Sequence, residues 1–332
     1  RRHRTNMDNK FHTNLIVSSS PHIVTESDTT RLMGSVLLAL APAWIASIYI
    51  FGLRALLLSV VCVAASVLFE YLFNAIVHKK QTVGDLSAAL TGLLIAFNGP
   101  ASFPFWQAII GCLFAIVVVK GLFGGIGKNF SNPAITARIF LFISFSANMS
   151  TWPVTRLAGA TDATTGATAL EQLASNGAMQ WSALDAFLGF IPGSFGETST
   201  LAILIGAAIL LFTGIASWKT MVSVFAGGAA MAYFFSALGC FDYPAYYHLI
   251  VGGFAFGAVF MATDPVTSAQ TNCGKWIYGF MVGALAVLIR VINPAYPEGM
   301  MLSILFMNAL APLIDYYVVN ANINRRLKRA TK

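Results

Sequence analysis

The stretch Ala55–Ile76, ALLLSVVCVAASVLFEYLFNAI, contains 22 residues, and Glu70 is its one charged residue. An α-helix needs about 20 mainly apolar residues to cross the hydrocarbon core of a bilayer. Because that core offers no water to the backbone amides, such a stretch satisfies its hydrogen bonds within a helix. The stretch therefore predicts a transmembrane helix.

The rest of the chain has the same character. Of its 332 residues, 57% are hydrophobic and 10% are charged, whereas a soluble domain carries about 25% charged residues. The third and eighth apolar segments are short, which favours broken or re-entrant helices at these two places. We predict an all-α polytopic membrane protein with about ten transmembrane helices, at 33–51, 55–76, 84–99, 104–121, 133–149, 198–215, 221–240, 248–263, 276–293 and 300–318.

The net charge is +7, and the basic residues gather near the two ends and in short loops. This distribution follows the positive-inside rule and lacks the aromatic-interleaved patch that a nucleic-acid surface needs, so we exclude nucleic acid as a partner. We expect both termini on the cytoplasmic side and an uncleaved first span. The regions are then a cytoplasmic N-terminal segment (1–32), five membrane helices (33–149), an outer-face loop (150–197), five more membrane helices (198–318) and a cytoplasmic basic tail (319–332).

The cysteines and histidines show no spacing that is typical of a metal site. The cysteines lie far apart without a C-x-x-C pattern, and the histidines form no i, i+4 pair. These spacings argue against a metal or iron–sulfur site built from this chain. The arrangement of Asp, His and Ser is not that of a hydrolase either. We therefore expect neither metal ligands nor catalytic residues.

Three polar stretches interrupt the apolar pattern. Asp162–Thr168, DATTGAT, fits D-x-x-[ST]-G-A-[ST] at every specified position, although its composition alone predicts a solvated loop. The stretch GGIGKNFSNPA at 124–134 lacks the G-x-x-x-x-G-K-[ST] pattern of a nucleotide-binding loop. In it, Asn132 is expected to cap a helix that begins at the next proline, or to help bind a polar ligand there. The third stretch, MATDPVTS at 261–268, predicts a helix end and a turn.

Charged residues inside the spans need a reason, because each costs about 2.5–3.5 kcal/mol at mid-bilayer. Arg138 is either a buried counter-ion, or a side chain that reaches the inner face, or a cation that stabilises an anionic flavin or its phosphate. Four other charged residues lie nearer span ends, where side chains extend to the interface: Glu70, Lys120, Arg290 and Asp315. Glu70 is also a candidate for a cation pathway.

Together, the three stretches resemble those of the membrane flavoprotein subunits of the Rnf and Nqr respiratory complexes, which also carry an S-S-P-H box, here Ser19–His22. The resemblance implies that a separate flavin transferase esterifies the phosphate of FMN to Thr168. Asp162, Thr165, Gly166 and Ala167 complete the recognised pattern. It also implies a site for non-covalent riboflavin, whose candidate residues are Lys128, Asn132, Arg138, Thr263 and Asp264.

The resemblance points to the RnfD subunits of Rnf complexes, which are ion-translocating ferredoxin:NAD oxidoreductases of the bacterial cytoplasmic membrane. The short segment before the first span favours RnfD, and the NqrB subunit of the Na⁺-translocating NADH:quinone reductase is the alternative. As an RnfD protein, the chain would relay electrons across the membrane, coupled to Na⁺ or H⁺ movement, without a substrate site of its own. Its partners would be membrane lipid and the subunits RnfA, RnfB, RnfC, RnfE and RnfG, above all the outer-face flavoprotein RnfG and the NAD-module protein RnfC.

The rival from another class is a solute channel or transporter of the urea-transporter type. Folds built from two related halves are common among transporters. Two pairs of boxes hint at such halves: Gly84–Ser87 with Gly196–Ser199, and Asn132–Ala134 with Asp264–Val266. A channel has no need of a flavin-attachment pattern, so fluorescence from covalently bound flavin distinguishes the two classes.

Overall fold

A computed structural model of the chain describes residues 28–153, 170, 181–241, 243–293 and 298–330. Its elements are α2 (Thr29–Phe51), α3 (Leu53–Ile76), η1 (Val83–Asp85), α4 (Ser87–Phe97), α5 (Phe105–Leu113), η2 (Phe114–Gly121), α6 (Pro133–Ser144), α7 (Ser146–Met149), α9 (Ala183–Leu188), α10 (Thr200–Phe212), α11 (Trp218–Ala237), α12 (Tyr247–Ile250), α13 (Phe254–Phe256), η4 (Gly257–Met261), α14 (Asn272–Ile292) and α15 (Gly299–Ala330). No β-strand occurs among the described residues. The all-α prediction is therefore confirmed.

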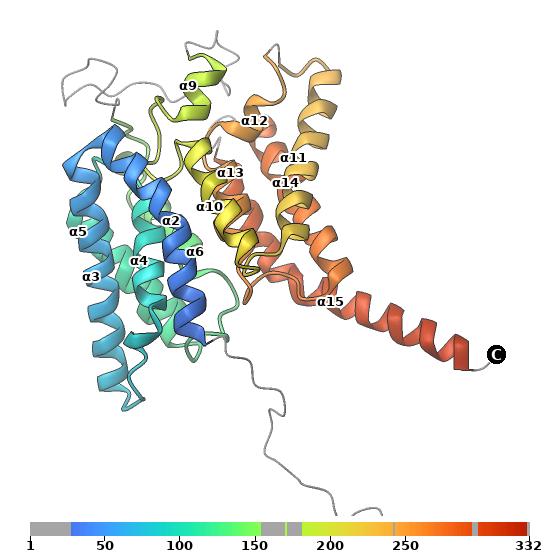
Figure 1. Cartoon of the computed structure of the whole chain (residues 1–332), viewed down its shortest axis with the longest axis horizontal. Coiled ribbons are helices and arrows are strands. Elements are labelled where there is room, and N and C mark those ends of the chain that lie inside the picture. Colours follow the sequence, from blue (N-terminus) through green and yellow to red (C-terminus); the bar gives the residue numbers. More distant parts are fainter. Residues whose placement is uncertain (1–27, 154–169, 171–180, 242, 294–297, 331–332) are drawn as a thin grey trace, which may run out of the picture.

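Each of the ten predicted spans contains helix. Five helices are long and apolar enough to cross a membrane by themselves: α2, α3, α11, α14 and α15. The other predicted spans are built from shorter apolar helices. Figure 1 shows α2 to α6 grouped on one side of the bundle and α10 to α14 on the other, with α2 packed against α10 between them. The chain is a multi-pass membrane protein.

The third and eighth spans are broken, as expected. In the third, α4 has 11 residues and follows Leu86, whose φ is 60°. In the eighth, α12 is followed by Gly252 at φ 69°, and the chain resumes in α13 and the π-helical η4. A left-handed residue cannot continue a right-handed helix. The end of α4 meets the segment before α10, where the Gly196 amide donates to the Phe97 carbonyl at 3.2 Å.

Helices approach closely where glycine faces a neighbouring backbone. A Cβ built on Gly283 of α14 would overlap with the carbonyl group of Val224 in α11. A Cβ on Gly206 of α10 would overlap in the same way with the carbonyl of Ala39 in α2. Small residues at such contacts let membrane helices pack backbone to backbone.

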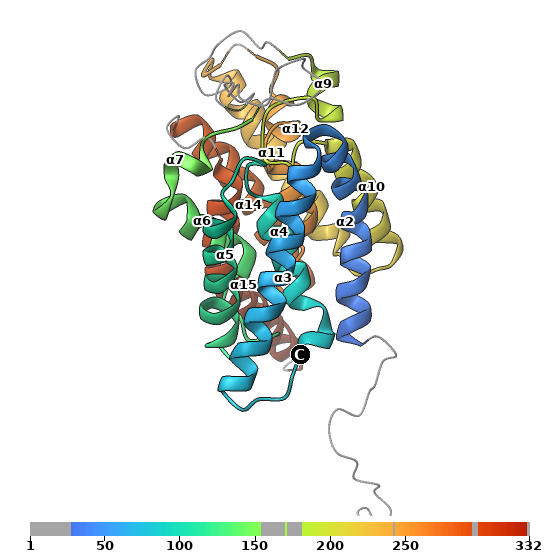
Figure 2. The ribbon, with the colours of Figure 1, turned by 90° about the vertical axis from the view of Figure 1, so that its left-hand side faces the viewer.

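The last helix is longer than the predicted tenth span. α15 continues past residue 318 through the basic tail to Ala330, and it contains Pro312. Asp315 accepts hydrogen bonds from the amides of Gln270 and Thr271 at 2.7 and 3.0 Å, so it ties α15 to the start of α14. The prediction that Asp315 extends to the interface is thus replaced by a capping role. Beyond this point α15 runs outward from the bundle (Figure 1), and Figure 2 looks almost along it.

The two pairs of similar boxes differ in whether their members occupy similar positions in the fold. Gly84–Ser87 leads into α4 and Gly196–Ser199 leads into α10, so both boxes precede short apolar helices. Asn132–Ala134 begins α6, whereas Asp264–Val266 lies in a turn. The first pair therefore occupies similar positions, and the second pair does not.

Candidate functional site

The glycine-rich box and the Thr-Asp-Pro box lie side by side. Asn132 Nδ2 donates to Asp264 Oδ2 at 3.4 Å. Asn132 also caps α6, because its Oδ1 accepts from the amide of Ala134 at 3.0 Å, as the sequence predicts. Asp264 accepts further hydrogen bonds from the Val266 amide at 3.1 Å and from Thr267 Oγ1 at 3.0 Å. The two boxes thus form one hydrogen-bonded unit.

A cavity opens between these boxes and α4. Ser87, Leu90, Thr91 and Leu94 line one wall, and their spacing of i, i+3, i+4 and i+7 places them on one face of the helix. The rest of the lining combines apolar with polar side chains, among them Leu210, Phe260, Asn129, Asn132, Thr263 and Asp264. The cavity can therefore accept a molecule with an apolar body and a polar edge.

Asn129 is a cavity residue that the sequence did not single out. Its Oδ1 is buried and has no hydrogen-bond partner among the described residues. A buried acceptor without a donor costs about 1–3 kcal/mol, so this atom suits a ligand that brings a donor. The neighbouring Lys128 is exposed and is not among the residues that line the cavity. The side chain of Lys128 therefore lies in a different environment from the side chains of Asn129 and Asn132.

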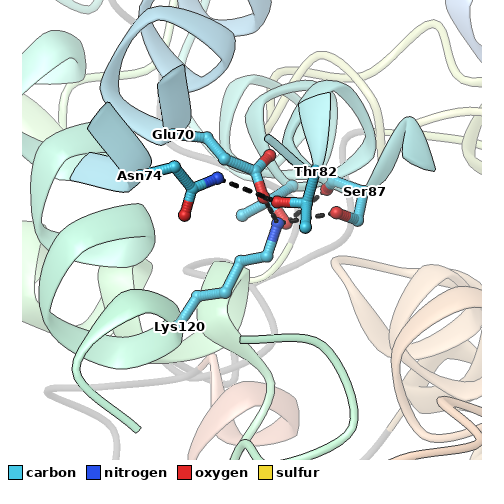
Figure 3. A network of polar contacts seen from close by, with 6 residues as sticks. Glu70, Asn74, Thr82, Ser87 and Lys120 are labelled. Atoms are coloured by element: carbon cyan, nitrogen blue, oxygen red, sulfur yellow. Dashed lines mark hydrogen bonds and ion pairs between the residues drawn. The ribbon is translucent and has the colours of Figure 1, made fainter. Parts of the chain in front are cut away.

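Lys120 lines the same cavity and forms a buried ion pair (Figure 3). Its side chain is 4% exposed, and its Nζ lies 2.7 Å from Glu70 Oε1 and 2.6 Å from Ser87 Oγ. Thr82 Oγ1 donates to the same Glu70 oxygen at 2.8 Å, and Asn74 Nδ2 donates to Thr82 at 3.0 Å. The expectation that Lys120 and Glu70 extend to the membrane interface was wrong, because each finds its counter-charge inside the protein.

Arg138 lies in a second ionic cluster and is not among the residues that line this cavity. Its guanidinium is 3.1 Å from Glu197 Oε1 and 3.5 Å from Glu298 Oε2. Arg138 is therefore a buried counter-ion, whereas a role beside a flavin stays a prediction. Burial raises the pKa of the Glu197 carboxyl, while the nearby Arg138 lowers it by favouring the charged form.

Arg290, in the last turn of α14, belongs to the same end of the bundle. It is 3% exposed, and its Nη1 donates to the His248 carbonyl at 2.6 Å. Its Nε and Nη2 have no hydrogen-bond partner within the described part of the chain. The prediction that Arg290 extends to the interface was thus wrong as well. A buried guanidinium with two spare donors suits an anionic group.

Leu170 is the described residue nearest in sequence to the predicted flavin-attachment stretch, and it lies close to Arg290. The predicted attachment residues Asp162, Thr165, Gly166, Ala167 and Thr168 lie outside the described residues, and Leu170 follows Thr168 by two positions. Leu170 is buried in a small apolar cluster with Ala186, Ile191, Tyr247 and Val251. Gly252 lies between Leu170 and Arg290, because a Cβ built on it would be 3.2 Å from Leu170 Cδ2 and also 3.2 Å from Arg290 Nη2. The side chains of Leu170 and Arg290 are therefore neighbours.

The cavity and Leu170 lie toward opposite ends of the bundle. Asp264 belongs to the loop that leads into the start of α14, whereas Arg290 lies in the last turn of that helix. A helix of 21 residues is about 30 Å long, which is the thickness of the hydrocarbon core. The two candidate regions thus lie toward opposite ends of α14.

A family model described as the NQR2, RnfD, RnfE family matches residues 16–324. The chain belongs to this family. Within it, the chain is 54% identical over 252 residues to the B-type subunit (NqrB) of the Na⁺-translocating NADH-quinone reductase of Chromohalobacter salexigens, covering 72% of the chain and 60% of that relative. Identity is 48% over 273 residues to the NqrB protein of Pseudomonas aeruginosa, covering 79% of the chain and 66% of the relative. The NqrB protein of Neisseria meningitidis is 49% identical over 278 residues, with the same two coverages.

These relatives bear on the choice between Rnf and Nqr. All three are named as the B-type component of the NADH-quinone reductase, so they favour the alternative interpretation over RnfD. The chain spans about three fifths to two thirds of their length. The length of the segment before the first span therefore does not distinguish RnfD from NqrB for this chain.

The structure brings together part of the predicted site. Asn132, Thr263 and Asp264 line one cavity, whereas Lys128 and Arg138 are not among its lining residues. Asn129 and Lys120 are two polar cavity residues that the sequence did not assign to this site. Asn129 stands beside Lys128 in the same box, and Lys120 is the one charged residue of segment 104–121. The sequence therefore shows both residues at notable positions, although a position in the sequence does not indicate which way the side chain points.

Proposed function

We propose that this chain is the membrane flavoprotein NqrB of a Na⁺-translocating NADH:quinone reductase. The observation that carries the proposal is the 54% identity over 252 residues to a relative of that kind. The other subunits of such a complex would be its partners, together with membrane lipid and a flavin transferase for maturation. Following the distribution of Lys and Arg, both termini lie on the cytoplasmic side of a bacterial cytoplasmic membrane and loop 150–197 lies on the outer face.

The first flavin in this proposal is FMN, esterified through its phosphate to Thr168. The complete D-x-x-T-G-A-T pattern supports the attachment. The described residues nearby fit an anionic group, because Leu170 anchors the chain beside Arg290, whose Nε and Nη2 are unpartnered within the described part of the chain. A bound flavin supplies a carrier of one or two electrons. The role of this end of the protein is to hold the phosphodiester near a buried positive charge.

The second flavin is a non-covalent riboflavin in the cavity between α4 and the two boxes. Asn129 and Asn132 offer hydrogen bonds to the polar edge of its ring system, and Asn129 Oδ1 lacks any other described partner. Leu94, Leu210 and Phe260 offer an apolar surface to the ring faces. This combination is typical of cofactor sites, which are mostly apolar with a few placed polar groups.

Two carriers toward opposite ends of the bundle suit a protein that passes electrons between the two faces of the membrane. The rest of the complex would deliver electrons to this chain and remove them. In the proposal the chain binds no NADH and reduces no substrate by itself. A solute channel, by contrast, needs neither a flavin-attachment pattern nor a cavity lined by a buried hydrogen-bond acceptor that lacks a donor.

The attachment is tested by co-producing the protein with its flavin transferase and viewing a denaturing gel under ultraviolet light. We expect a fluorescent band for the wild type and for Thr164→Ala, which changes an unspecified position of the pattern. We expect Thr168→Ala to lose the band, because the esterified hydroxyl is gone. A dark wild-type band would refute the flavoprotein proposal, and a bright Thr168→Ala band would refute the site.

The cavity is tested by measuring released flavin after acid precipitation, which separates riboflavin from covalently held FMN. Asn129→Ala is expected to lower the riboflavin content several-fold and to leave the fluorescent band of Thr168 unchanged. Asn148→Ala is the matched control, because Asn148 donates to Gln107 instead of lining the cavity. Unchanged riboflavin in Asn129→Ala would exclude this cavity as the site.

A further inference from the structure

The C-terminal arm of α15, residues 316–330, is amphipathic. Tyr316, Val319, Ile323 and Leu327 recur at helical spacing and so share one face. They are 62%, 45%, 47% and 58% exposed, respectively. The cations of the arm are Arg325, Arg326, Lys328 and Arg329, and at about 3.6 residues per turn most of them lie on the face opposite Ile323. The arm therefore presents an exposed apolar stripe backed by positive charge.

The arm begins at the end of the bundle where α11 and α14 start. Asp315 caps the start of α14 through the Gln270 and Thr271 amides. The start of α11 is adjacent, because Lys219 Nζ lies 2.8 Å from Asn272 Oδ1. From there the arm runs outward, across the direction of α11 and α14 (Figure 1). Fifteen helical residues extend about 22 Å, so the arm reaches well beyond the bundle.

We propose that the C-terminal arm lies in the plane of the membrane surface, with its apolar stripe at the boundary between headgroups and acyl chains and its cations on anionic lipid headgroups. Amphipathic helices with basic polar faces bind in this way, and clusters of Lys and Arg beside a span attract anionic lipid. Tyr is favoured at membrane interfaces. The position and direction of the arm fit a helix that leaves a span at the interface. This inference does not depend on a bound flavin.

The test places a fluorophore on each face of the arm in the full-length chain. Cys240→Ser and Cys273→Ser remove the exposed cysteines, since Cys62 and Cys112 are buried. Ile323→Cys then carries a nitrobenzoxadiazole probe on the apolar stripe, and Ala321→Cys carries it on the other face as the matched control. In vesicles of phosphatidylcholine with phosphatidylglycerol, we expect nitroxide lipid to quench the probe at 323 several-fold more than aqueous iodide does, and the reverse at 321.

A charge-removal variant tests the role of the cations. With Arg325, Arg326, Lys328 and Arg329 all changed to Gln, lipid quenching at 323 in anionic vesicles should fall to the level seen in pure phosphatidylcholine. Equal iodide quenching at 323 and 321 would overturn the proposal, because the arm would then lie in water. Protection of position 323 that needs the partner proteins of the complex would also overturn it, because a protein surface would then cover the stripe.

Discussion

At the scale of single residues, the pair of Lys120 and Glu70 is the sharpest feature. Lys120 lines the candidate flavin cavity and also a second, polar cavity that includes Asn74, Thr82 and Asp85. Its ammonium group is held by Glu70 Oε1 and Ser87 Oγ, while Glu70 Oε2 is buried without a described partner. Two opposite charges placed this way stabilise each other. Either one alone would be buried without compensation.

Lys120→Met is expected to destabilise the protein by roughly 3–5 kcal/mol, because Glu70 is left as an uncompensated buried charge. The double variant Lys120→Met/Glu70→Gln should recover much of that loss, since both charges are removed. The melting temperature of the purified protein in detergent measures both effects. Lys128→Met, at an exposed position, should change the stability by less than about 0.5 kcal/mol. If the double variant lost as much stability as the two single variants together, the two charges would not be coupled.

At the scale of elements, the contact between α11 and α14 depends on the absence of side chains. A Cβ on Gly283 would overlap with the Val224 carbonyl, and a Cβ on Gly227 would overlap with the Phe280 carbonyl. Each glycine therefore lets the backbone of the other helix approach. The close contact holds the start of α14 beside the start of α11, and the loop with Asp264 leads into α14 at this end.

Gly283→Ala should lower stability by about 1–3 kcal/mol, because the added methyl group forces the two helices apart. Alanine is otherwise about 1 kcal/mol better than glycine within a helix. Gly34→Ala in α2 is therefore the matched control, since a Cβ there would make only an ordinary contact of 3.7 Å with Leu86. The monodisperse fraction in size-exclusion chromatography and the melting temperature report the difference. A neutral Gly283→Ala variant would contradict the packing.

At the scale of the whole molecule, the orientation in the membrane is open to a direct test with two native cysteines. α11 has 20 residues, which extend about 30 Å, and Cys240 follows its end closely. Cys273 stands in the first turn of α14, beside the start of α11. Both cysteines are exposed. They therefore lie at opposite ends of the bundle.

A membrane-impermeant maleimide should label Cys240 in intact cells and Cys273 only after permeabilisation, because the basic loops favour a cytoplasmic start of α14. The variants Cys240→Ser and Cys273→Ser assign each label by its loss. The reversed pattern would contradict the proposed orientation. Labelling of both sites in intact cells would contradict the membrane-spanning arrangement of α11.

Much of the fold could be predicted from local sequence. Apolar segments gave ten helical regions, and the two shortest segments are among the broken spans. Asn132 before a proline predicted the cap of α6. The charge partners could not be predicted, because Arg138 pairs with Glu197 and Glu298, which are distant in the chain. Lys120 and Glu70 were misassigned for the same reason. The sequence shows that a charged residue lies near a span end, but not whether its side chain contacts lipid headgroups or another charged side chain.

By itself the sequence determined that the chain is an all-α membrane protein, because a helix in hydrocarbon is fixed by the length and apolar character of each segment alone. It also supplied the pattern at Asp162–Thr168 on which the proposed flavin attachment rests, because a pattern is a property of consecutive residues. The tertiary structure decided which polar groups meet: the cavity beside Asn132 and Asp264, the buried pair of Lys120 and Glu70, and the cluster around Arg138 and Arg290. These contacts join helices whose relative positions follow from packing, and packing depends on the whole chain at once.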